Sequence, residues 1–303
     1  MFGLESFFSF SDLWSPLMLI ATVLIIILYL GLTGPFRQRF ADSTPVPPFR
    51  KGLFIIGVLL LYFVQGGPVN VLSHMMFTFH MIMMSISYII VPPLLMLGIP
   101  SWLWRFMLDR AFVKKLNWLM HPILTAVLFN TLFSLYHVPA VHDYVMLNYD
   151  VHILYYIALF IASMMMWWPV VSPVPEWPGI THVKKMGYIF LNGVLITPAC
   201  ALIIFAGDPL YSTYTDPDTW ALAMGYCVAG DPSQLISSFG GPEFFNWFDP
   251  VEDQQLGGIV MKLIQETMYG AILAYVFSQW FRKEGKDDDD VVESTLDGHW
   301  KQA

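Results

Sequence analysis

Seven long apolar runs constrain this chain more than any other feature of its sequence. They lie at residues 16–32, 53–67, 71–97, 119–138, 151–170, 186–206 and 258–281. About 20 helical residues cross the hydrocarbon core of a bilayer, so each run is a candidate membrane helix, although the second is short. Hydrophobic residues make up 56% of the 303 residues and charged residues only 13%, which is more apolar surface than one soluble core needs. The sequence therefore predicts an all-α integral membrane protein with seven transmembrane helices.

The tripeptide "GGP" at 66–68 separates the second run from the third. Within residues 52–104 the only ionisable side chains other than tyrosine are two histidines, so charge does not mark the boundary. Two glycines followed by a proline interrupt a helix and suit a tight reversal. One helix through both runs would be too long for one bilayer, so we expect two spans.

The distribution of Lys and Arg predicts the orientation. The first and third loops contain four each, the fifth loop and the start of the C-terminal tail contain two each, and the even-numbered loops contain none. Because cytoplasmic loops carry the excess of these residues, the N-terminus is predicted to lie outside and the C-terminus in the cytoplasm. No Lys or Arg precedes the first run, so we expect that span to be retained rather than cleaved as a signal peptide.

Two acidic segments flank the last run. We expect residues 1–282 to form one seven-helix membrane domain, whose outer loop at 207–257 carries eight carboxylates, and residues 283–303 to form a disordered cytoplasmic tail. The aromatic run "EFFNWF" at 243–248 makes the outer loop a candidate partner surface, although docking at the membrane interface is an alternative. With a net charge of −8, we expect no nucleic-acid partner.

Five of the eight histidines fall at one level of the predicted bundle. His74 and His80 lie in the outer half of the third run, His137 at the outer end of the fourth, His142 in the following loop and His152 at the start of the fifth. Ionisable groups at membrane depth are costly and mark functional sites by default. We therefore expect a metal or haem site near the outer face.

The residues around His80 favour copper among the metals. Met76, His80 and Met84 are spaced by four residues and would share one helix face. Thioether and imidazole together suit Cu(I), and Asp143 and Asp150 in the nearby loop would form an entrance. The expected metal ligands are His74, Met76, His80, Met84, His137 and His152. The structural alternative is that the methionines fill gaps and the histidines form ordinary hydrogen bonds.

Glu266 is the only carboxylate well inside a predicted span, and Lys262 precedes it by four residues. The pair could neutralise itself within the helix, or Glu266 could face the histidines as a ligand or proton acceptor. Both readings stay open. Cys200 and Cys227 form no C-x-x-C pattern, so thiol redox chemistry and covalent c-type haem attachment are not indicated.

Three stretches resemble the caa(3)-type CtaG family of bacterial cytochrome c oxidase assembly factors. They are "DQQLGGIVM" at 253–261, "HMIMMSISYIIVPPLL" at 80–95 and "MMMWWPV" at 164–170. The resemblance spans all seven runs and implies a multi-pass protein of the bacterial plasma membrane, needed to make active caa(3) oxidase. It implies oxidase subunits as partners besides the lipid bilayer, copper as the cargo and a role as assembly factor rather than enzyme.

The family pattern has His-x-x-x-His in the third and fifth spans. The first histidines match His80 and His152, whereas the second positions are Met84 and Tyr156. The resemblance therefore implies copper coordination richer in thioether than the common pattern. His137 and Asp253 also match family positions, and we include Asp253 and Glu266 among the functional residues.

Other functions compete with copper handling. A haem-binding redox protein or haem-related enzyme is the main alternative, because histidines at one depth on adjacent helices also serve as axial ligands. A seven-helix receptor or retinal protein is disfavoured because the last run offers only Lys262, which lies too near the surface for a Schiff base. A transporter is disfavoured because the sequence shows no repeat with paired broken helices.

Overall fold

The structure is a computed structural model that describes residues 4–300 apart from residues 110–116, 175–176, 178 and 229–231. The side chains of residue 232 and of residues 283–300 are likewise outside the description. The statements below refer to the described residues.

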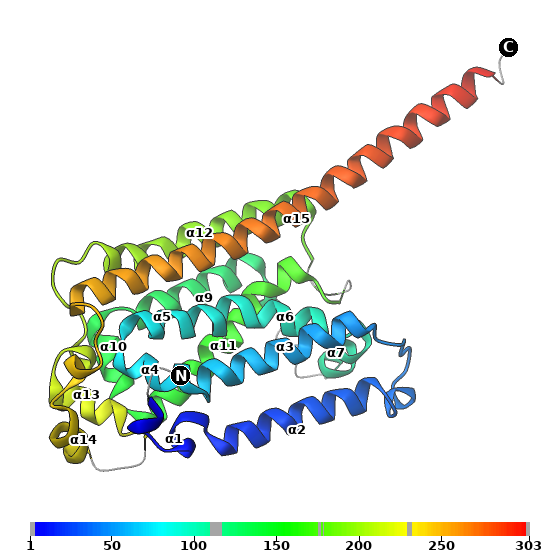
Figure 1. Ribbon diagram of the computed structural model, residues 1–303. Coiled ribbons are helices and arrows are strands. Elements are labelled where there is room, and N and C mark those ends of the chain that lie inside the picture. The colour runs from blue at the N-terminus through cyan, green and yellow to red at the C-terminus, as the bar shows by residue number, and fades with distance from the viewer. Residues whose placement is uncertain (1–3, 110–116, 175–176, 178, 229–231, 301–303) are drawn as a thin grey trace.

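Long helices lie side by side and form one bundle (Figure 1). The spans are α2 (Pro16–Thr33), α3 (Pro48–Gln65), α5 (Phe77–Ser85) continued by α6 (Val91–Gly98), α9 (Pro122–Tyr136), α11 (Tyr149–Val171), α12 (His182–Ile204) and α15 (Pro250–Trp300). Six of these segments are long and apolar enough to cross a membrane, and the count is seven if α9 and the bent helix after it form one span. The described residues contain no strand, so the predicted all-helical membrane fold is confirmed in this coarser form.

Short helices cover one end of the bundle, called the α10 end below. They are α1 (Phe10–Trp14), α4 (Pro68–Met75), α10 (Pro139–Met146), α13 (Pro217–Met224) and α14 (Pro232–Phe239). Figure 1 shows them on its left, whereas α7 (Ser101–Leu108) lies at the opposite end, called the α7 end. The loop between α12 and α15 therefore folds over the α10 end.

The third span begins later than its sequence suggests. Met76 has an extended backbone, with φ −131° and ψ 131°, and separates α4 from α5. The expected helix face through Met76, His80 and Met84 is therefore broken before His80. The cause is a distant cap: the Asp253 carboxylate accepts hydrogen bonds from the backbone N–H groups of Phe77, at 2.6 Å, and Thr78, at 3.3 Å.

A wide π-helical turn (Ile86–Ile90, η3) joins α5 to α6. Pro92 has no N–H group, so it cannot bond the carbonyl of Tyr88 four residues earlier. Ser163 of α11 donates its hydroxyl proton to that carbonyl instead. The irregular turn is thus satisfied by a neighbouring helix, as an interruption inside a membrane requires.

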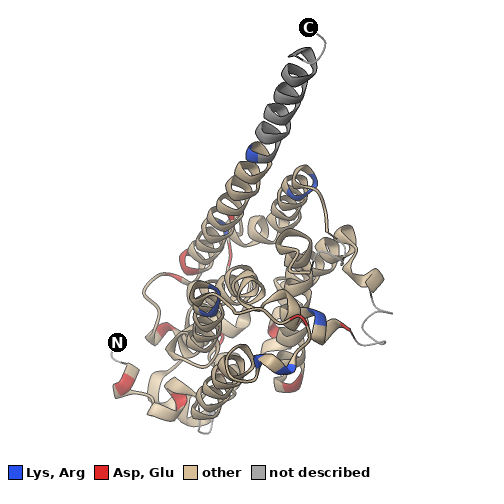
Figure 2. Ribbon diagram, turned by 90° about the vertical axis from the view of Figure 1, so that its right-hand side faces the viewer, with Lys and Arg blue, Asp and Glu red and all other residues tan. Residues whose placement is uncertain are grey.

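Basic residues gather at the α7 end. Figure 2 looks along the bundle onto this end and shows Lys and Arg where several helices begin or finish. They include Arg37 and Arg39 in η2 (Arg37–Arg39), Arg50 and Lys51 in α3, Arg105 in α7, and Lys184 and Lys185 in α12. This arrangement agrees with a cytoplasmic α7 end, and the orientation itself stays a prediction.

The last helix continues beyond the bundle. α15 extends to Trp300 and projects away from its neighbours, where the sequence predicts a disordered tail (Figure 1). No proline follows Pro250, and extending an existing helix is far less costly than starting one. The backbone of α15 thus runs as helix to Trp300, and the disordered tail expected at 283–303 stays a prediction, as does the division into two parts.

Candidate functional site

A sharp bend between two helices brings three histidines together. α9 and α10 meet at 79°, which places His137, the residue after α9, near His142 of α10. His80 of α5 faces both: its ring centre is 5.3 Å from that of His142 and 6.4 Å from that of His137. All three side chains are fully buried. We call His80, His137 and His142 the three-histidine cluster.

The ring nitrogens of this cluster are only partly hydrogen-bonded. His137 Nδ1–H donates to the Phe133 carbonyl at 2.7 Å, and His142 Nδ1 lies 3.4 Å from Asp143 Oδ1. Among the described residues, His137 Nε2, His142 Nε2 and both nitrogens of His80 have no hydrogen-bond partner; we call these four the open nitrogens. A buried unpaired polar atom costs about 1–3 kcal/mol, so four in one place need an explanation.

The arrangement of the bonded nitrogens is typical of metal-binding histidines. Such a histidine usually donates one ring N–H to a carbonyl or carboxylate, which fixes the tautomer and leaves the lone pair of the other nitrogen for the metal. His137 does this with a carbonyl and His142 with a carboxylate. Both therefore present Nε2 as a neutral donor atom.

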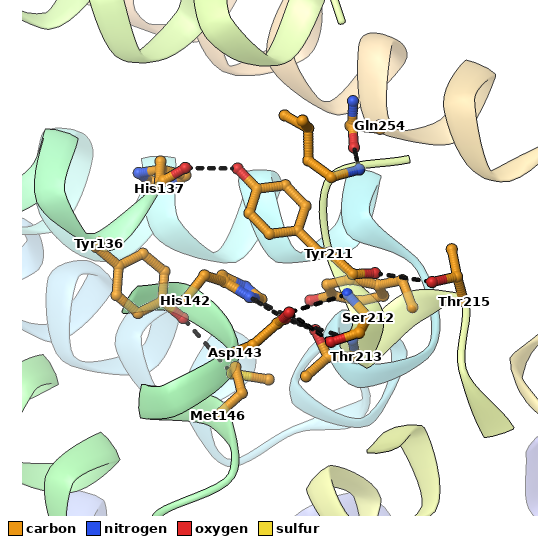
Figure 3. A network of polar contacts seen from close by, with 12 residues as sticks. Tyr136, His137, His142, Asp143, Met146, Tyr211, Ser212, Thr213, Thr215 and Gln254 are labelled. Atoms are coloured by element: carbon orange, nitrogen blue, oxygen red, sulfur yellow. Dashed lines mark hydrogen bonds and ion pairs between the residues drawn. The ribbon is translucent and has the colours of Figure 1, made fainter. Parts of the chain in front are cut away.

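Asp143 fastens the loop after α12 over the cluster. Its carboxylate accepts hydrogen bonds from the backbone N–H of Ser212, at 3.1 Å, from the Ser212 hydroxyl, and from the Thr213 hydroxyl, at 3.1 Å. Figure 3 shows these contacts together with the Tyr211 hydroxyl, which donates to the His137 carbonyl at 2.9 Å. The same carboxylate thus orients His142 and holds its cover in place.

Aromatic rings enclose the three-histidine cluster. Tyr136 stacks on the His80 ring, with ring centres 5.6 Å apart and planes 13° apart. Phe77 also stacks on the His80 ring, with ring centres 5.7 Å apart. Tyr211 and Tyr214 pack against His142 at 4.4 and 5.8 Å. The open nitrogens therefore lie in a buried, aromatic interior.

His74 and His152 form a separate group. Their rings stack with centres 6.1 Å apart, and His74 Nε2 lies 3.3 Å from the sulfur of Cys227. Burial lowers the pKa of His74 to about 4, because the charged imidazolium loses its hydration, so this ring is neutral at pH 7. Burial also raises the pKa of the Cys227 thiol to about 12. We call His74, His152 and Cys227 the side cluster.

The "DQQLGG" stretch, called the "DQQLGG" fastener below, holds α5 in place through hydrogen bonds and close packing. Besides the Asp253 cap, Gln254 accepts a hydrogen bond from the Leu210 N–H at 2.7 Å. A Cβ on Gly257 would lie 2.9 Å from the Phe77 ring, and one on Gly258 would lie 2.8 Å from Ile204. The two glycines thus let α15 pack closely on α5 and α12, which sets the position of His80.

The comparison with protein families agrees with this architecture. The sequence model described as "Cytochrome c oxidase caa3 assembly factor (Caa3_CtaG)" matches residues 27–283, which is most of the chain. The chain belongs to this family. The resemblance found in the sequence is therefore confirmed. The match includes the three-histidine cluster, the side cluster and the "DQQLGG" fastener, so all of these belong to the Caa3_CtaG region of the chain. Searches of curated proteins and of solved structures found no match.

The two methionines expected as ligands lie in different surroundings. Met76 packs in an apolar cluster with Leu72 and Trp220 near the N-terminal segment. Met84 is fully buried in the main core of the Caa3_CtaG bundle, one helical turn below His80. In the described part of the chain no group of three or more His, Cys, Asp or Glu side chains is already arranged to hold a metal ion. The ligand set named from the sequence therefore stays a prediction.

The carboxylates take different places. Asp150 is exposed in the first turn of α11, whereas Asp143 is engaged by Ser212 and Thr213. Glu266 is exposed on α15 and lies 2.8 Å from Lys262 Nζ, so it forms the helix pair that the sequence suggested as one reading. It does not belong to the buried histidine groups described above.

Two residues of these clusters were not among the expected ligands. His142 was expected in a loop. The stretch "HVPAVHD" at 137–143 could have added it to the expected ligands, because a proline between the two histidines permits a sharp bend. Cys227 has no local signal at all, because it meets His74 across 153 residues of sequence.

Proposed function

We propose that this chain helps to assemble a caa(3)-type cytochrome c oxidase by holding a copper ion at the three-histidine cluster and passing it to an oxidase subunit. The observation that carries this proposal is the set of four open nitrogens in one buried place. Imidazole is a good ligand for copper, and unprotonated Nε2 atoms need no deprotonation before they bind.

The surroundings of the cluster support a transient rather than a resident cargo. His137 and His142 are anchored through Nδ1, whereas His80 has no hydrogen bond of its own among the described residues. Its ring can therefore turn toward or away from the other two at little cost in hydrogen bonding. The aromatic walls exclude water and favour the singly charged ion Cu(I) over Cu(II), because a smaller charge loses less hydration on burial.

The covering loop offers a way to release the ion. Residues 211–214 lie over the cluster and are fastened by Asp143, so breaking the contacts to Ser212 and Thr213 would uncover His142. A subunit of the oxidase that displaced this loop would gain access to the copper. No chemical transformation is part of this role, so we assign the chain as an assembly factor and not as an enzyme.

The outer loop supplies a surface for such a partner. Phe244 and Trp247 are more than half exposed, whereas Phe245 packs inward against Phe239. Exposed aromatic residues near carboxylates suit a protein interface. By the distribution of Lys and Arg, this surface and both histidine clusters lie on the outer face of the bacterial plasma membrane.

Replacing His80 with Leu tests the proposal. Leu is apolar and of similar size, so it removes two open nitrogens without leaving a large cavity. We expect the variant to unfold at the same temperature as the unaltered protein or a higher one, yet to leave the oxidase without a mature copper centre at limiting copper. Oxidase absorption spectra and copper content give the readout.

His182→Leu is the matched control, because His182 begins α12 at the α7 end of the bundle. Normal oxidase maturation with His80→Leu would overturn the copper assignment. A Soret band in the purified protein would instead support the haem alternative.

A further inference from the structure

A cavity opens on the side of the bundle, and the three-histidine cluster is not part of its lining. Its volume is about 510 Å³, and residues of α2, α3, α4 and α11 line it together with Cys227. Its polar lining residues include Gln65, Asn70, His74, His152, Tyr156 and Cys227. Apolar residues of α11 such as Ile153 and Ile157 stand at its edge and are exposed on the surface of the bundle. The side cluster therefore lies at the wall of a space that a small ion can enter.

Asn70 positions two of the donor atoms toward each other. Its backbone carbonyl accepts a hydrogen bond from His74 Nδ1–H at 2.9 Å, which leaves Nε2 with its lone pair. Its side-chain amide donates to the Cys227 sulfur at 3.6 Å. Cys227 Sγ lies 3.2 Å from Nδ1 and 3.3 Å from Nε2 of His74, so the thiol and the imidazole are neighbours, and a metal ion between Nε2 and the sulfur requires them to move apart.

We propose that Cys227 and His74, with His152 as a third donor, form a second site for a soft monovalent ion, Cu(I), reached through the side cavity. Thiolate and imidazole are the ligands that select Cu(I), which accepts two or three donors. Binding replaces the proton of the Cys227 thiol with copper, and that proton leaves to the solvent. Copper stays Cu(I) throughout, so no oxidant or reductant takes part.

The two copper sites lie on opposite sides of a tyrosine pair. The hydroxyls of Tyr136 and Tyr156 are 3.1 Å apart. Tyr136 stacks on His80 of the three-histidine cluster, and Tyr156 packs on His152 with ring centres 4.1 Å apart. The sites are thus neighbours without shared ligands. The inference rests on the proposed function for the identity of the cargo, whereas the site rests on its own geometry.

The first experiment loads the full-length protein in lipid nanodiscs with one equivalent of Cu(I) without oxygen. His80→Leu is used as the background, so that the three-histidine cluster does not compete. X-ray absorption should then show a copper–sulfur distance, and that signal should be lost when Cys227→Ser is added. Cys200→Ser is the matched control, because Cys200 is buried beside Met261 and should leave the signal unchanged.

Each other outcome of this experiment overturns the second site. If the His80→Leu background binds no copper, the side cluster is not a site, although the proposed function at the three-histidine cluster can still hold. If the sulfur signal persists without Cys227, methionine supplies it. Failure of the proposed function would appear differently, as normal oxidase maturation in the His80→Leu variant.

A second experiment separates a built site from a reactive thiol. With Cys200 replaced by Ala, Cys227 is the only thiol in the chain. One equivalent of Ag(I), a stable substitute for Cu(I), should protect it from N-ethylmaleimide, and His74→Ala should abolish this protection. Protection that persists in His74→Ala would mean that the thiol binds the ion alone, which would overturn the proposed pair.

Discussion

The three-histidine cluster and the pair formed by Asn130 and Asn192 are both polar groups buried in one bundle. Asn130 Nδ2–H donates to Asn192 Oδ1 at 2.8 Å, and Asn192 Nδ2–H donates to the Tyr188 carbonyl at 2.8 Å. One of the four side-chain polar atoms of this pair lacks a partner in the described structure, compared with four of the six ring nitrogens of the cluster.

This difference separates two uses of a buried polar residue. The asparagines link α9 to α12, as polar groups commonly do between membrane helices. The histidines gain little from each other and leave their donor atoms unoccupied. We infer that the asparagine pair contributes mainly to stability and the histidine cluster mainly to binding. The following variants test that division.

Asp253→Ala should have the largest effect, because it should reduce both the stability of the bundle and its copper binding. It removes the acceptor for the N–H groups of Phe77 and Thr78 and leaves two buried donors unpaired. We expect a loss of about 3 kcal/mol in the free energy of unfolding, together with lower copper binding as α5 shifts. Denaturation in detergent and copper titration measure the two effects. Glu252→Ala is the exposed control, and a stable Asp253→Ala protein would contradict the capping role.

Asp143→Asn should weaken copper binding strongly while leaving the bundle folded. The amide can still accept from Ser212, but it orients His142 less well than the carboxylate does. Loss of such an outer partner typically costs about 10–100-fold in metal affinity. Competition titration with a Cu(I) chelator gives this value.

Asp150→Asn is the comparison for Asp143→Asn, because Asp150 is exposed. It should slow copper loading without changing the affinity if Asp150 forms an entrance. Equal affinities in both variants would show that Asp143 does not support His142.

Asn192→Leu should reduce stability and leave copper binding intact. The change removes the acceptor for Asn130 and should lower the free energy of unfolding by about 1 kcal/mol, the scale of hydrogen bonds between membrane helices. Thermal unfolding of the purified protein is the measurement, with Thr197→Val as an exposed control. If Asn192→Leu lost copper binding without losing stability, the proposed division would be wrong.

Glu266→Gln should have the smallest effect. Glu266 is 60% exposed and its partner Lys262 also contacts Gln265, so the loss should be below about 0.5 kcal/mol. Copper binding should be unchanged, since Glu266 does not face the histidines. Copper titration is the measurement. Weaker copper binding in this variant would support the alternative in which Glu266 is a ligand or proton acceptor for the histidines.

The sequence predicts how deep the histidines of the site lie in the bundle, but it predicts few of their side-chain contacts. The depth of His80, His137 and His152 follows from where the apolar runs begin and end. Their division into two clusters does not, because it depends on which way each helix turns and on the break at Met76. Likewise, the "DQQLGG" stretch contributed to the resemblance, whereas its contacts with Phe77 are visible only in the structure.

The sequence by itself determined the apolar runs, the helical class, the gathering of Lys and Arg in alternate loops and the family. Each of these depends on local composition, since a bilayer selects for about 20 apolar residues in a row wherever they occur. The tertiary structure alone decided that His142 joins His80 and His137, and that Cys227 meets His74. The contacts of His80 with His142 and of His74 with Cys227 join residues far apart in the chain, and no local pattern specifies which distant side chains meet.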